Sequence, residues 1–380
     1  MAEKSILILS PFFSPNIGGV ESYLDDLCRY LIKQNRKVYV VTYQPLTTRA
    51  RGLRFEKKGD LEIRRIAWFG HNLFHRLEPY PLLEFLYLTP WLFIHTLIFL
   101  IKNSSKIEVM HAQGLNAAFI TRYLAPLFKK KAVVSTCAVY HFKKNSLIAR
   151  IIQRIFLSFH KILSLGEFSR QELIGIGLPE NRIKAYALWV NEEIYKPQDK
   201  EKSKSEIGLK DKFVVLFVGR FIEIKGVSLL IDIAKQVDTK INFCFIGDNG
   251  PLLDALEKAA AVRENIILIK NIRGHQLVPY YQAADILVVP SQYDEAFGKV
   301  IIEALFCGTP VIASNRGAIP YILDSSVGVV VEPTLENIKK QIEYFYHNPE
   351  ALSQLSKNCR PYAEKFFSEK NAEMISKAYD

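Results

Sequence analysis

The chain has 380 residues, of which 49% are hydrophobic, and it carries 50 Lys and Arg against 39 Asp and Glu. This length is long for one hydrophobic core and predicts two domains of ordinary size. The five cysteines have no paired spacing, which excludes a disulfide framework or a zinc-binding pattern and favours a reducing, cytosolic setting. The first residues, MAEKSILILS, have a strand pattern and not that of a signal peptide, so we expect a cytoplasmic protein.

The positive charge is concentrated in the first half of the chain. Residues 1–195 hold 27 Lys and Arg and 15 Asp and Glu, whereas residues 196–380 hold 23 and 24. A basic composition common to all proteins of a lineage would not leave one half neutral. We therefore expect the first half to meet an anionic membrane, a lipid phosphate or an acidic glycan. No sequence motif supports nucleic acid as the partner.

The first half alternates strand and helix patterns, which predicts a doubly wound parallel sheet. Its strand-like apolar runs are Ser5–Ser10, Lys37–Thr42, Val109–Ala112, Ala132–Thr136 and Ile162–Leu165. Gly18 and Gly19 open the loop after the first strand, and Val20–Gln34 has the pattern of an amphipathic helix. Glycines at a helix start let backbone amides approach an anion closely, although a Gly-Gly pair is most often only a turn.

The segment Tyr80–Ile101 is unusually apolar, with Glu84 as its only charged residue. About 20 apolar residues suffice to span a bilayer. Because Pro90 interrupts the run and an α/β domain surrounds it, we rank a buried or partly exposed pair of helices first. Shallow insertion into a membrane face ranks second, and a membrane span ranks third. The basic flanks, which include Arg76 and Lys102, support shallow insertion.

The polar, lysine-rich segment Tyr195–Lys212 predicts a linker between two domains. A second alternating series follows it, with strand-like runs at Phe213–Val218, Asn242–Ile246, Ile266–Ile269, Ile286–Val289 and Val311–Ala313. Each of these runs ends in a loop that contains Gly, Pro or Ser. In such sheets, ligands bind beyond the carboxyl ends of the strands.

The first loop of the second series carries two cations. Arg220 and Lys225 follow the strand and lie close to Gly219 in the sequence. Arginine offers a fork of donors and lysine a point charge, which together suit a diphosphate. Two surface cations are the plain alternative, but a position beyond a strand end favours phosphate binding. The next loop, Phe245–Pro251, contains Gly247 and is a second glycine-rich turn from strand to helix.

The segment Tyr293–Ser314 is the most informative part of the chain. Glu295 ends a polar loop, Phe297 and Gly298 follow, and Glu303 lies in an apolar run that predicts a helix. A helix start near Gly298 offers free N–H groups and a positive dipole end, which suit an anion or a sugar hydroxyl. Glu303 interrupts an apolar face and needs hydrogen-bond donors, because an unpaired buried polar group costs several kcal/mol. Sugar hydroxyls are such donors.

This segment, with seven residues between its two glutamates, resembles the signature of the family-4 retaining glycosyltransferases, and the resemblance extends over nearly the whole chain. It implies the α/β fold called GT-B, with two facing Rossmann-like domains. Residues 1–190 are expected to bind the acceptor and residues 191–360 the nucleotide sugar. A last helix, within 361–380, is expected to cross back to the first domain.

The resemblance also implies an activity. The family transfers a hexose, with retention of configuration and without a metal, from a nucleotide sugar such as a UDP- or GDP-sugar. For this chain we expect a lipid-linked or glycan acceptor and peripheral association with the inner face of the membrane. The chain has no Asp-x-Asp triplet of the kind that holds a metal in the other major glycosyltransferase fold. We expect neither a metal nor a resident cofactor, since the nucleotide sugar is itself a substrate.

The resemblance further implies roles for individual residues. Arg220 and Lys225 are expected to stabilise the leaving diphosphate. Glu295 is expected to hold sugar hydroxyls, and Glu303 to bind the ribose. The expected catalytic residues are Glu295, Arg220, Lys225, His111 and Cys137. The expected donor-binding residues are Gly18, Gly19, Gly219, Arg220, Lys225, Gly247, Phe297, Gly298 and Glu303.

The acceptor half departs from the family pattern. Cys137 stands where many relatives have a histidine that contacts the reacting sugar, and His141 and His111 are alternatives for that role. Leu188–Asn191 replaces the usual Asn-Gly-Val-Asp, and Tyr321 stands where relatives often have Glu. Two other functions therefore stay open. A sugar-nucleotide epimerase would consume the donor without a glycosylated product, and a silent component of a glycosylation complex would bind the donor without turnover.

Overall fold

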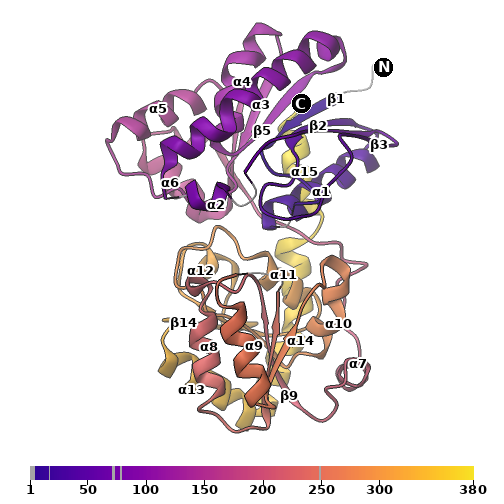
Figure 1. Ribbon diagram of the computed structural model, residues 1–380, viewed down its shortest axis with the longest axis vertical. Coiled ribbons are helices and arrows are strands. Elements are labelled where there is room, and N and C mark those ends of the chain that lie inside the picture. The colour runs from indigo at the N-terminus through magenta and orange to yellow at the C-terminus, as the bar shows by residue number, and fades with distance from the viewer. Residues whose placement is uncertain (1–4, 17, 71–72, 78, 248–249) are drawn as a thin grey trace. The chain divides into compact units, whose positions relative to one another are not determined.

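The chain divides into two compact units, each built around one largely parallel sheet (Figure 1). The computed structural model describes residues 5–16, 18–70, 73–77, 79–247 and 250–380. Unit 1 comprises Met1–Leu188 and Lys370–Asp380, and unit 2 comprises Trp189–Glu369. Each unit has the α/β architecture of a Rossmann-like domain, so the predicted fold class is confirmed.

The sheet of unit 1 has eight strands within the described residues, in the order β3-β4-β2-β1-β5-β6-β7-β8. The strands are β1 (Ser5–Leu9), β2 (Lys37–Tyr43), β3 (Phe55–Lys58), β4 (Leu61–Ile66), β5 (Val109–Gln113), β6 (Lys131–Ser135), β7 (Lys161–Leu165) and β8 (Ile183–Tyr186). The five predicted strands are confirmed as β1, β2, β5, β6 and β7. The prediction missed β8 and the hairpin of β3 and β4, which pair antiparallel and whose charged residues conceal the apolar alternation.

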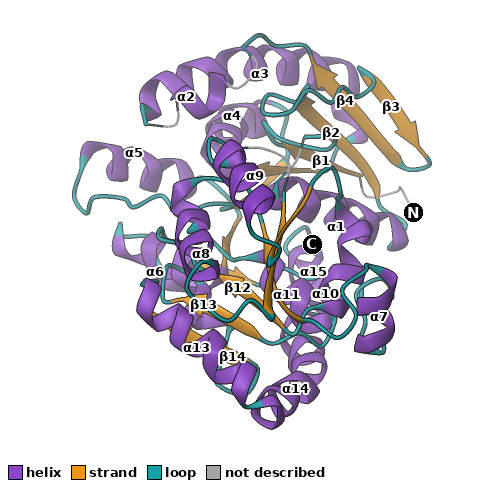
Figure 2. Cartoon of the chain, turned by 60° about the horizontal axis from the view of Figure 1, so that its bottom comes forward, coloured by secondary structure: helices purple, strands orange, loops and turns teal. Residues whose placement is uncertain are grey.

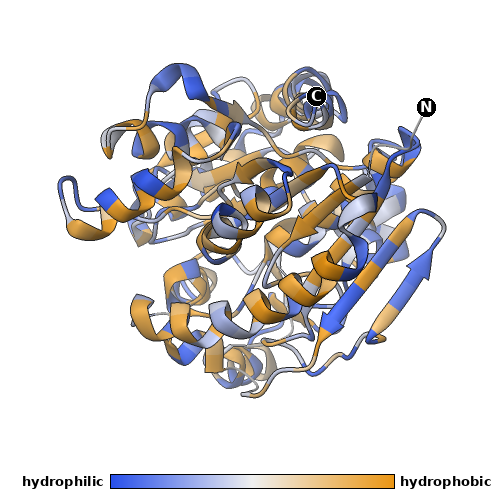
Figure 3. Ribbon diagram, turned by 90° about the horizontal axis from the view of Figure 1, so that it is seen from above, coloured by the Kyte–Doolittle hydropathy of each residue, from blue (hydrophilic) through white to orange (hydrophobic). Residues whose placement is uncertain are grey.

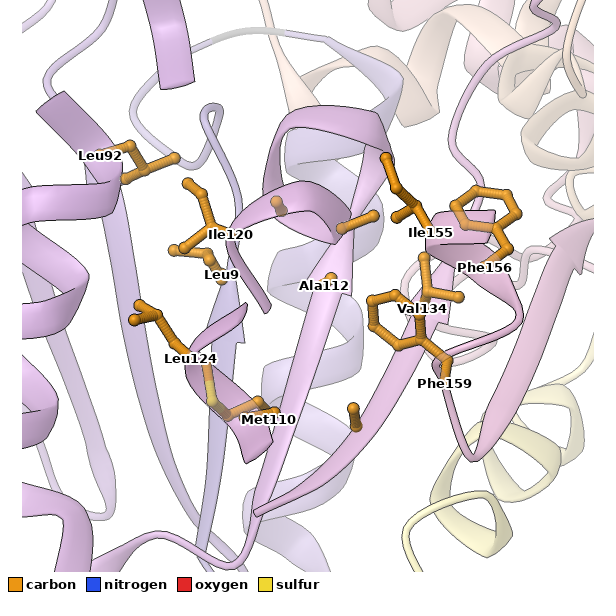
Figure 4. Close-up of a cluster of buried hydrophobic side chains, with 14 of the residues drawn as sticks. Leu9, Leu92, Met110, Ala112, Ile120, Leu124, Val134, Ile155, Phe156 and Phe159 are labelled. Carbon is orange, nitrogen blue, oxygen red and sulfur yellow. The ribbon is translucent and has the colours of Figure 1, made fainter. Parts of the chain in front are cut away.

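Helices cover both faces of this sheet. They are α1 (Gly19–Lys33), α2 (Leu73–Leu77), α3 (Pro81–Asn103), α4 (Gly114–Leu127), α5 (Leu147–Phe156), α6 (Gly166–Gly175) and α15 (Lys370–Lys377), with short 3-10 turns η1 (Ser104–Lys106) and η2 (Glu180–Arg182). α4 contacts both α3 and α5, and α1 contacts α15 (Figure 2). Leu9, Ile120 and Phe156 belong to the core that the α3, α4 and α5 layer closes against the sheet (Figure 4).

The apolar segment after residue 80 forms one helix, α3, which continues through Pro90. The expected pair of helices is therefore wrong. A proline inside a helix costs about 3 kcal/mol, but Leu88 and Leu92 are fully buried on either side of it and hold the helix in place. Within the described residues, Pro81–Lys106 is long and apolar enough to cross a membrane, and 39% of its most apolar window is buried.

The sheet of unit 2 has six strands within the described residues, in the order β11-β10-β9-β12-β13-β14, and all its pairs are parallel. The strands are β9 (Phe213–Val218), β10 (Ile241–Ile246), β11 (Ile266–Ile269), β12 (Ile286–Val289), β13 (Val311–Ser314) and β14 (Gly328–Val331). All five predicted strands are confirmed, and β14 was missed. Colouring by hydropathy shows the strands inside the sheets as largely hydrophobic (Figure 3).

The helices of unit 2 pack on both faces of its sheet (Figure 1). They are α7 (Lys200–Glu206), α8 (Val227–Ala234), α9 (Leu253–Val262), α10 (Val278–Ala283), α11 (Lys299–Phe306), α12 (Ile319–Ile322), α13 (Leu335–His347) and α14 (Pro349–Phe367), with 3-10 turns η3 (Glu223–Lys225) and η4 (Gly274–Leu277). The core of this unit includes Phe243, Ile312 and Ile342.

The structure differs from what the sequence predicts in two details of chain connection, the linker and the continuity of the last helix. The expected linker, Tyr195–Lys212, belongs to unit 2 and contains α7, where Lys204 Nζ lies 3.0 Å from Asp285 Oδ2. The expected single helix at the C-terminus is interrupted, because α14 ends at Phe367 and Ser368 has an extended backbone. The chain changes unit there, between Glu369 and Lys370.

Candidate functional site

The loops that carry most of the predicted site residues follow β9 and β12, which are neighbours at the centre of the unit 2 sheet. After β9, the next two strands along the chain, β10 and β11, are added on one side of β9. β12 lies on the other side of β9, and β13 and β14 follow it toward the opposite edge of the sheet. The strand order therefore reverses between β9 and β12. In open α/β sheets, this switch point at the carboxyl ends of the strands is where ligands bind.

Lys225 and Glu295 meet at this switch point, one after each of the two central strands. Lys225 Nζ donates to Glu295 Oε1 over 2.6 Å, although 70 residues separate the pair. Ser291 Oγ donates to the same oxygen, and Tyr293 OH donates to Oε2 over 2.9 Å. The ring of Tyr293 also lies under the ammonium group, with its centroid 4.8 Å from Lys225 Nζ. A cation and a carboxylate are thus held together where phosphate and sugar are expected.

The loop after β9 packs backbone to backbone against the loop after β10. A β-carbon on Gly247 would lie 2.2 Å from the carbonyl oxygen of Gly219, so any larger residue would force the two loops apart. Arg220 is exposed, and its guanidinium has no hydrogen bond or ion pair with the residues that the structure describes. It is available to an anion from solvent. Asp248 and Asn249 of the second glycine-rich loop lie outside the described residues.

Helix α11 begins where the sequence predicted a helix start. Gly298 is its N-cap residue with a φ of 85°, a left-handed conformation that favours glycine, and no side chain caps the first turn. Phe297 is 3% exposed and packs edge-on against Phe367, which anchors the turn. The first N–H groups of a helix without a side-chain cap can bind an anion.

Glu303 is buried on α11, as its place in the apolar run predicted. The hydroxyl of Tyr281 donates to Glu303 Oε2 over 2.7 Å. Burial, and then the Glu303 charge, raise the pKa of Tyr281 well above its usual value, so this hydroxyl stays a donor at neutral pH. The protein itself therefore supplies one of the hydrogen bonds that the buried Glu303 carboxylate needs.

Sequence reasoning missed Ser291, Tyr293 and Tyr281, whose hydroxyls donate to the two glutamates. Ser291 and Tyr293 lie within four residues of Glu295, so a search for hydroxyls beside the first glutamate would have found them. Tyr281 lies on α10, and its sequence position gives no sign that it reaches α11.

His111 lies in the core of unit 1, and its expected contact with the reacting sugar stays a prediction. It is fully buried, its Nδ1 lies 2.7 Å from Tyr379 OH, and its Nε2 lies 2.7 Å from Ser135 Oγ. Both ring nitrogens are occupied. Burial lowers the pKa of His111 to about 3, which makes it a neutral connector between β5, β6 and the end of the chain.

The His111 environment predicts a loss of stability in acid. Its ordinary pKa is 6.5 and its folded pKa is about 3, so the unfolded chain binds more protons between these values and stability falls as the pH falls. Between pH 7 and pH 5 we expect about 2 kcal/mol of unfolding free energy to be lost through this group. Urea denaturation of the wild type and of His111→Gln, each at pH 7 and at pH 5, measures this loss of unfolding free energy. Equal pH dependence in the two proteins would contradict the prediction.

Cys137 and the paired glycines belong to another part of unit 1. Cys137 Sγ lies 3.2 Å from Gln113 Oε1, and burial, then the charge of Glu21, raise the pKa of Cys137 to about 12. It is a neutral thiol at neutral pH. A β-carbon on Gly18 would lie 2.5 Å from Glu21 Oε2, so the start of α1 already holds a carboxylate. Roles for Cys137, Gly18 and Gly19 in transfer stay predictions, as does the alternative, His141, which is exposed.

In the part of the chain that the structure describes, no group of three or more His, Cys, Asp or Glu residues is placed to hold a metal ion. The predicted charged residues of unit 2 include two cations, Arg220 and Lys225, and two carboxylates, Glu295 and Glu303, of which Lys225 and Glu295 pair directly. This set can bind a diphosphate and the hydroxyls of sugars attached to it.

Both halves of the chain match models of known protein families. Residues 17–192 match the model described as Glycosyltransferase Family 4, and residues 199–366 match the model described as Glycosyl transferases group 1. Together the two matches extend over nearly the whole chain and confirm the resemblance noted in the sequence.

Individual proteins are similar over long stretches. The chain is 26% identical to a component of the phosphatidylinositol N-acetylglucosaminyltransferase of Homo sapiens, over 99% of this chain and 76% of that protein. It is 28% identical to an uncharacterized 41.2 kDa protein in the cps region of Klebsiella pneumoniae, over 69% of this chain and 75% of the other.

Solved structures share the fold at low sequence identity. Sucrose-phosphate synthase from Thermosynechococcus elongatus has a TM-score of 0.80 at 19% identity, over 99% of this chain and 98% of that one. Anabaena HepE in complex with UDP has a TM-score of 0.78 at 17% identity, over 98% of each chain. These likenesses confirm the expected GT-B fold.

Proposed function

Because the chain belongs to family 4 of the glycosyltransferases, we propose that it transfers a hexose from a nucleoside-diphosphate sugar to an acceptor, with retention of configuration. The observation that carries the proposal is the Lys225–Glu295 pair at the switch point of unit 2. A cation for the leaving diphosphate and a carboxylate for the sugar lie within one hydrogen bond of each other.

The contacts of this pair define what each residue does. In the absence of donor, Lys225 and Glu295 neutralise each other. The diphosphate competes for Lys225, with Arg220 as a second cation and the start of α11 as a source of N–H groups. Ser291 and Tyr293 keep the Glu295 carboxylate in place while it accepts hydrogen bonds from the sugar. Glu303 accepts from the ribose with its remaining capacity, since one of its oxygens already accepts from Tyr281.

The proposed reaction takes place on one face of the sugar. The bond from the anomeric carbon to the diphosphate oxygen breaks as the bond to the acceptor oxygen forms. The proton of the acceptor hydroxyl passes to an oxygen of the departing phosphate. Arg220 and Lys225 stabilise the negative charge that develops on that leaving group.

A panel of nucleotide sugars tests the proposal. A ligand that binds only the folded protein raises the unfolding temperature, so at least one UDP- or GDP-sugar is expected to stabilise the protein. That donor is then incubated with membrane extracts containing acceptors. A glycosylated product supports transfer, whereas donor consumed without such a product indicates an epimerase. Stabilisation without any consumption indicates a silent binding component.

Activity is expected to be independent of divalent metal. Arg220 and Lys225 supply the positive charge that a metal supplies in other transferases, so EDTA should change the rate of transfer less than about twofold. Enzyme treated with EDTA and then given Mg²⁺ or Mn²⁺ is the control. An absolute requirement for either ion would contradict the assigned site.

We further propose a lipid-linked acceptor and peripheral association with an anionic membrane. Two observations on unit 1 support this: the excess positive charge of residues 1–195 and the outer face of α3. Apolar residues at least 37% exposed run along the length of that helix: Leu82, Leu83, Leu86, Trp91, Ile94, Ile98 and Ile101. Such a strip suits the boundary between headgroups and acyl chains. The human relative, by its name, acts on phosphatidylinositol.

A further inference from the structure

Helix α5 of unit 1 carries an apolar strip that faces solvent in addition to the one that faces the core. Ala149, Ile152 and Phe156 are buried against the sheet. Leu147, Ile148 and Ile151 are 74%, 61% and 46% exposed. Positions i, i+1 and i+4 lie on one side of a helix, so these three side chains form a single patch. A helix that only covered a core would be polar on that side.

The cations around this patch lack acidic partners. Residues 143–161 contain five Lys and Arg and no Asp or Glu. Among the described residues, the side chains of Lys143, Lys144, Arg150 and Arg154 have no ion pair. Other cations of unit 1 do have one, as Arg65 has with Glu56. Four unpaired cations beside exposed aliphatic side chains suit an anionic partner that also accepts apolar groups.

A hollow lies next to the patch, between α5 and the end of α6. Its volume is about 370 Å³, and its lining includes Lys144, Arg150 and Gln153 together with Gly175–Gly177. Gln153 Nε2 donates to the carbonyl oxygen of Gly177 over 2.8 Å, which holds the two sides together. No acidic residue lines the hollow among the residues that the structure describes. Its two cations fit a phosphate group.

We infer that the α5 surface, defined as Lys144, Leu147, Ile148, Arg150 and Ile151, binds an anionic bilayer. Lys144 and Arg150 bind headgroup phosphates, and the three aliphatic side chains enter the interface. This inference rests on the membrane association proposed above and assigns it a second contact besides α3. α4 lies between α3 and α5 in unit 1 and contacts both (Figure 2). The two exposed strips are therefore on helices of one layer.

Flotation of the full-length protein with vesicles tests the inference. One set of vesicles is phosphatidylcholine, and in the other about a third of the lipid is phosphatidylglycerol. The wild type is expected to float with the anionic set. Lys144→Gln/Arg150→Gln should reduce the bound fraction at low salt about tenfold or more, because two charges near an anionic surface are lost. Ile148→Ser/Ile151→Ser should float at low salt but dissociate as salt screens the remaining charges.

The matched control is Lys340→Gln/Lys357→Gln, which removes the same charge from exposed lysines of unit 2 and should float like the wild type. The circular dichroism spectrum and unfolding temperature of every variant, compared with those of the wild type, confirm that each is folded. Flotation of both α5 variants at the wild-type level would overturn the inference and leave membrane association in place. Failure of the wild type to float with anionic vesicles at low salt would overturn both. Neither result affects the donor site.

Discussion

Glu295→Gln is expected to lower kcat/KM for sugar transfer by about 100-fold to 1,000-fold, the usual effect of removing one group that stabilises charge in a transition state. The amide keeps the size of the side chain. Ser291 and Tyr293 donate to different oxygens of Glu295, so the single amide oxygen can accept from one of them, and the amide nitrogen can donate to the other hydroxyl. It removes the charge that Lys225 and the sugar hydroxyls contact. Glu295→Ala is a poorer test, because it leaves three buried or partly buried donors without an acceptor, at about 1–3 kcal/mol each.

The matched control for Glu295→Gln is Glu257→Gln. Glu257 also belongs to unit 2 and also pairs with a lysine, Lys270, at 2.7 Å, but both of these side chains are more than 40% exposed. Exposed pairs contribute little to stability, so this variant should transfer sugar like the wild type. Initial rates and unfolding temperatures of all three proteins are compared. Near-normal transfer by a folded Glu295→Gln protein would remove Glu295 from the proposed mechanism.

Gly317→Ala is expected to reduce transfer by about 100-fold through its effect on Glu295. Gly317 has a φ of 59°, and a β-carbon there would lie 2.4 Å from the carbonyl oxygen of Glu295. The same turn holds the loop in place, because Ala318 N donates to that oxygen and Gly317 N donates to Asp294 Oδ1, each over 2.8 Å. An added methyl group must displace the Glu295 loop, and a misplacement of about 1 Å can cost about 100-fold in rate.

Gly274→Ala separates this displacement from simple backbone strain. Gly274 has a φ of 53° in the same unit, but a β-carbon there meets no atom within 4 Å. Both variants place alanine in the left-handed region, at a cost of about 1–2 kcal/mol. Both should therefore unfold at a lower temperature, whereas only Gly317→Ala should lose transfer. Similar rates for the two proteins would show that the turn does not position Glu295.

The fold was predictable wherever strands are continuous apolar runs. Phe213–Val218 was placed to the residue, because a strand buried on both faces has no polar interruption. The β3 and β4 hairpin was missed because Lys57 and Lys58 lie on the exposed edge strand β3, and Glu62 interrupts the apolar pattern of β4. α7 was read as a linker because its sequence is polar, yet Lys204 is 5% exposed and pairs with Asp285. In both cases the structure depends on contacts with residues distant in the sequence, which a local pattern does not show.

The candidate site was predictable in its residue types but not in its pairing. Lys225 and Glu295 were assigned separately, to the phosphate and the sugar, and only the adjacency of β9 and β12 brings them within 2.6 Å of each other. His111 shows the opposite case. Its position at a strand end fits a catalytic histidine, but no local pattern indicates that Tyr379, 268 residues away, contacts one ring nitrogen. Strand order and chain termini are not visible in local sequence patterns.

Calorimetric titration with UDP and GDP tests most directly whether the switch point of unit 2 is the donor site. Without Lys225, the Glu295 carboxylate faces the diphosphate with no cation between them, and a charged hydrogen bond is lost. The account predicts that the wild type binds one of the two nucleotides and that Lys225→Ala binds it about 10-fold to 100-fold more weakly. Lys270→Ala should bind it normally. Equal affinity of the wild type and Lys225→Ala would contradict the account, because the nucleotide would then bind elsewhere.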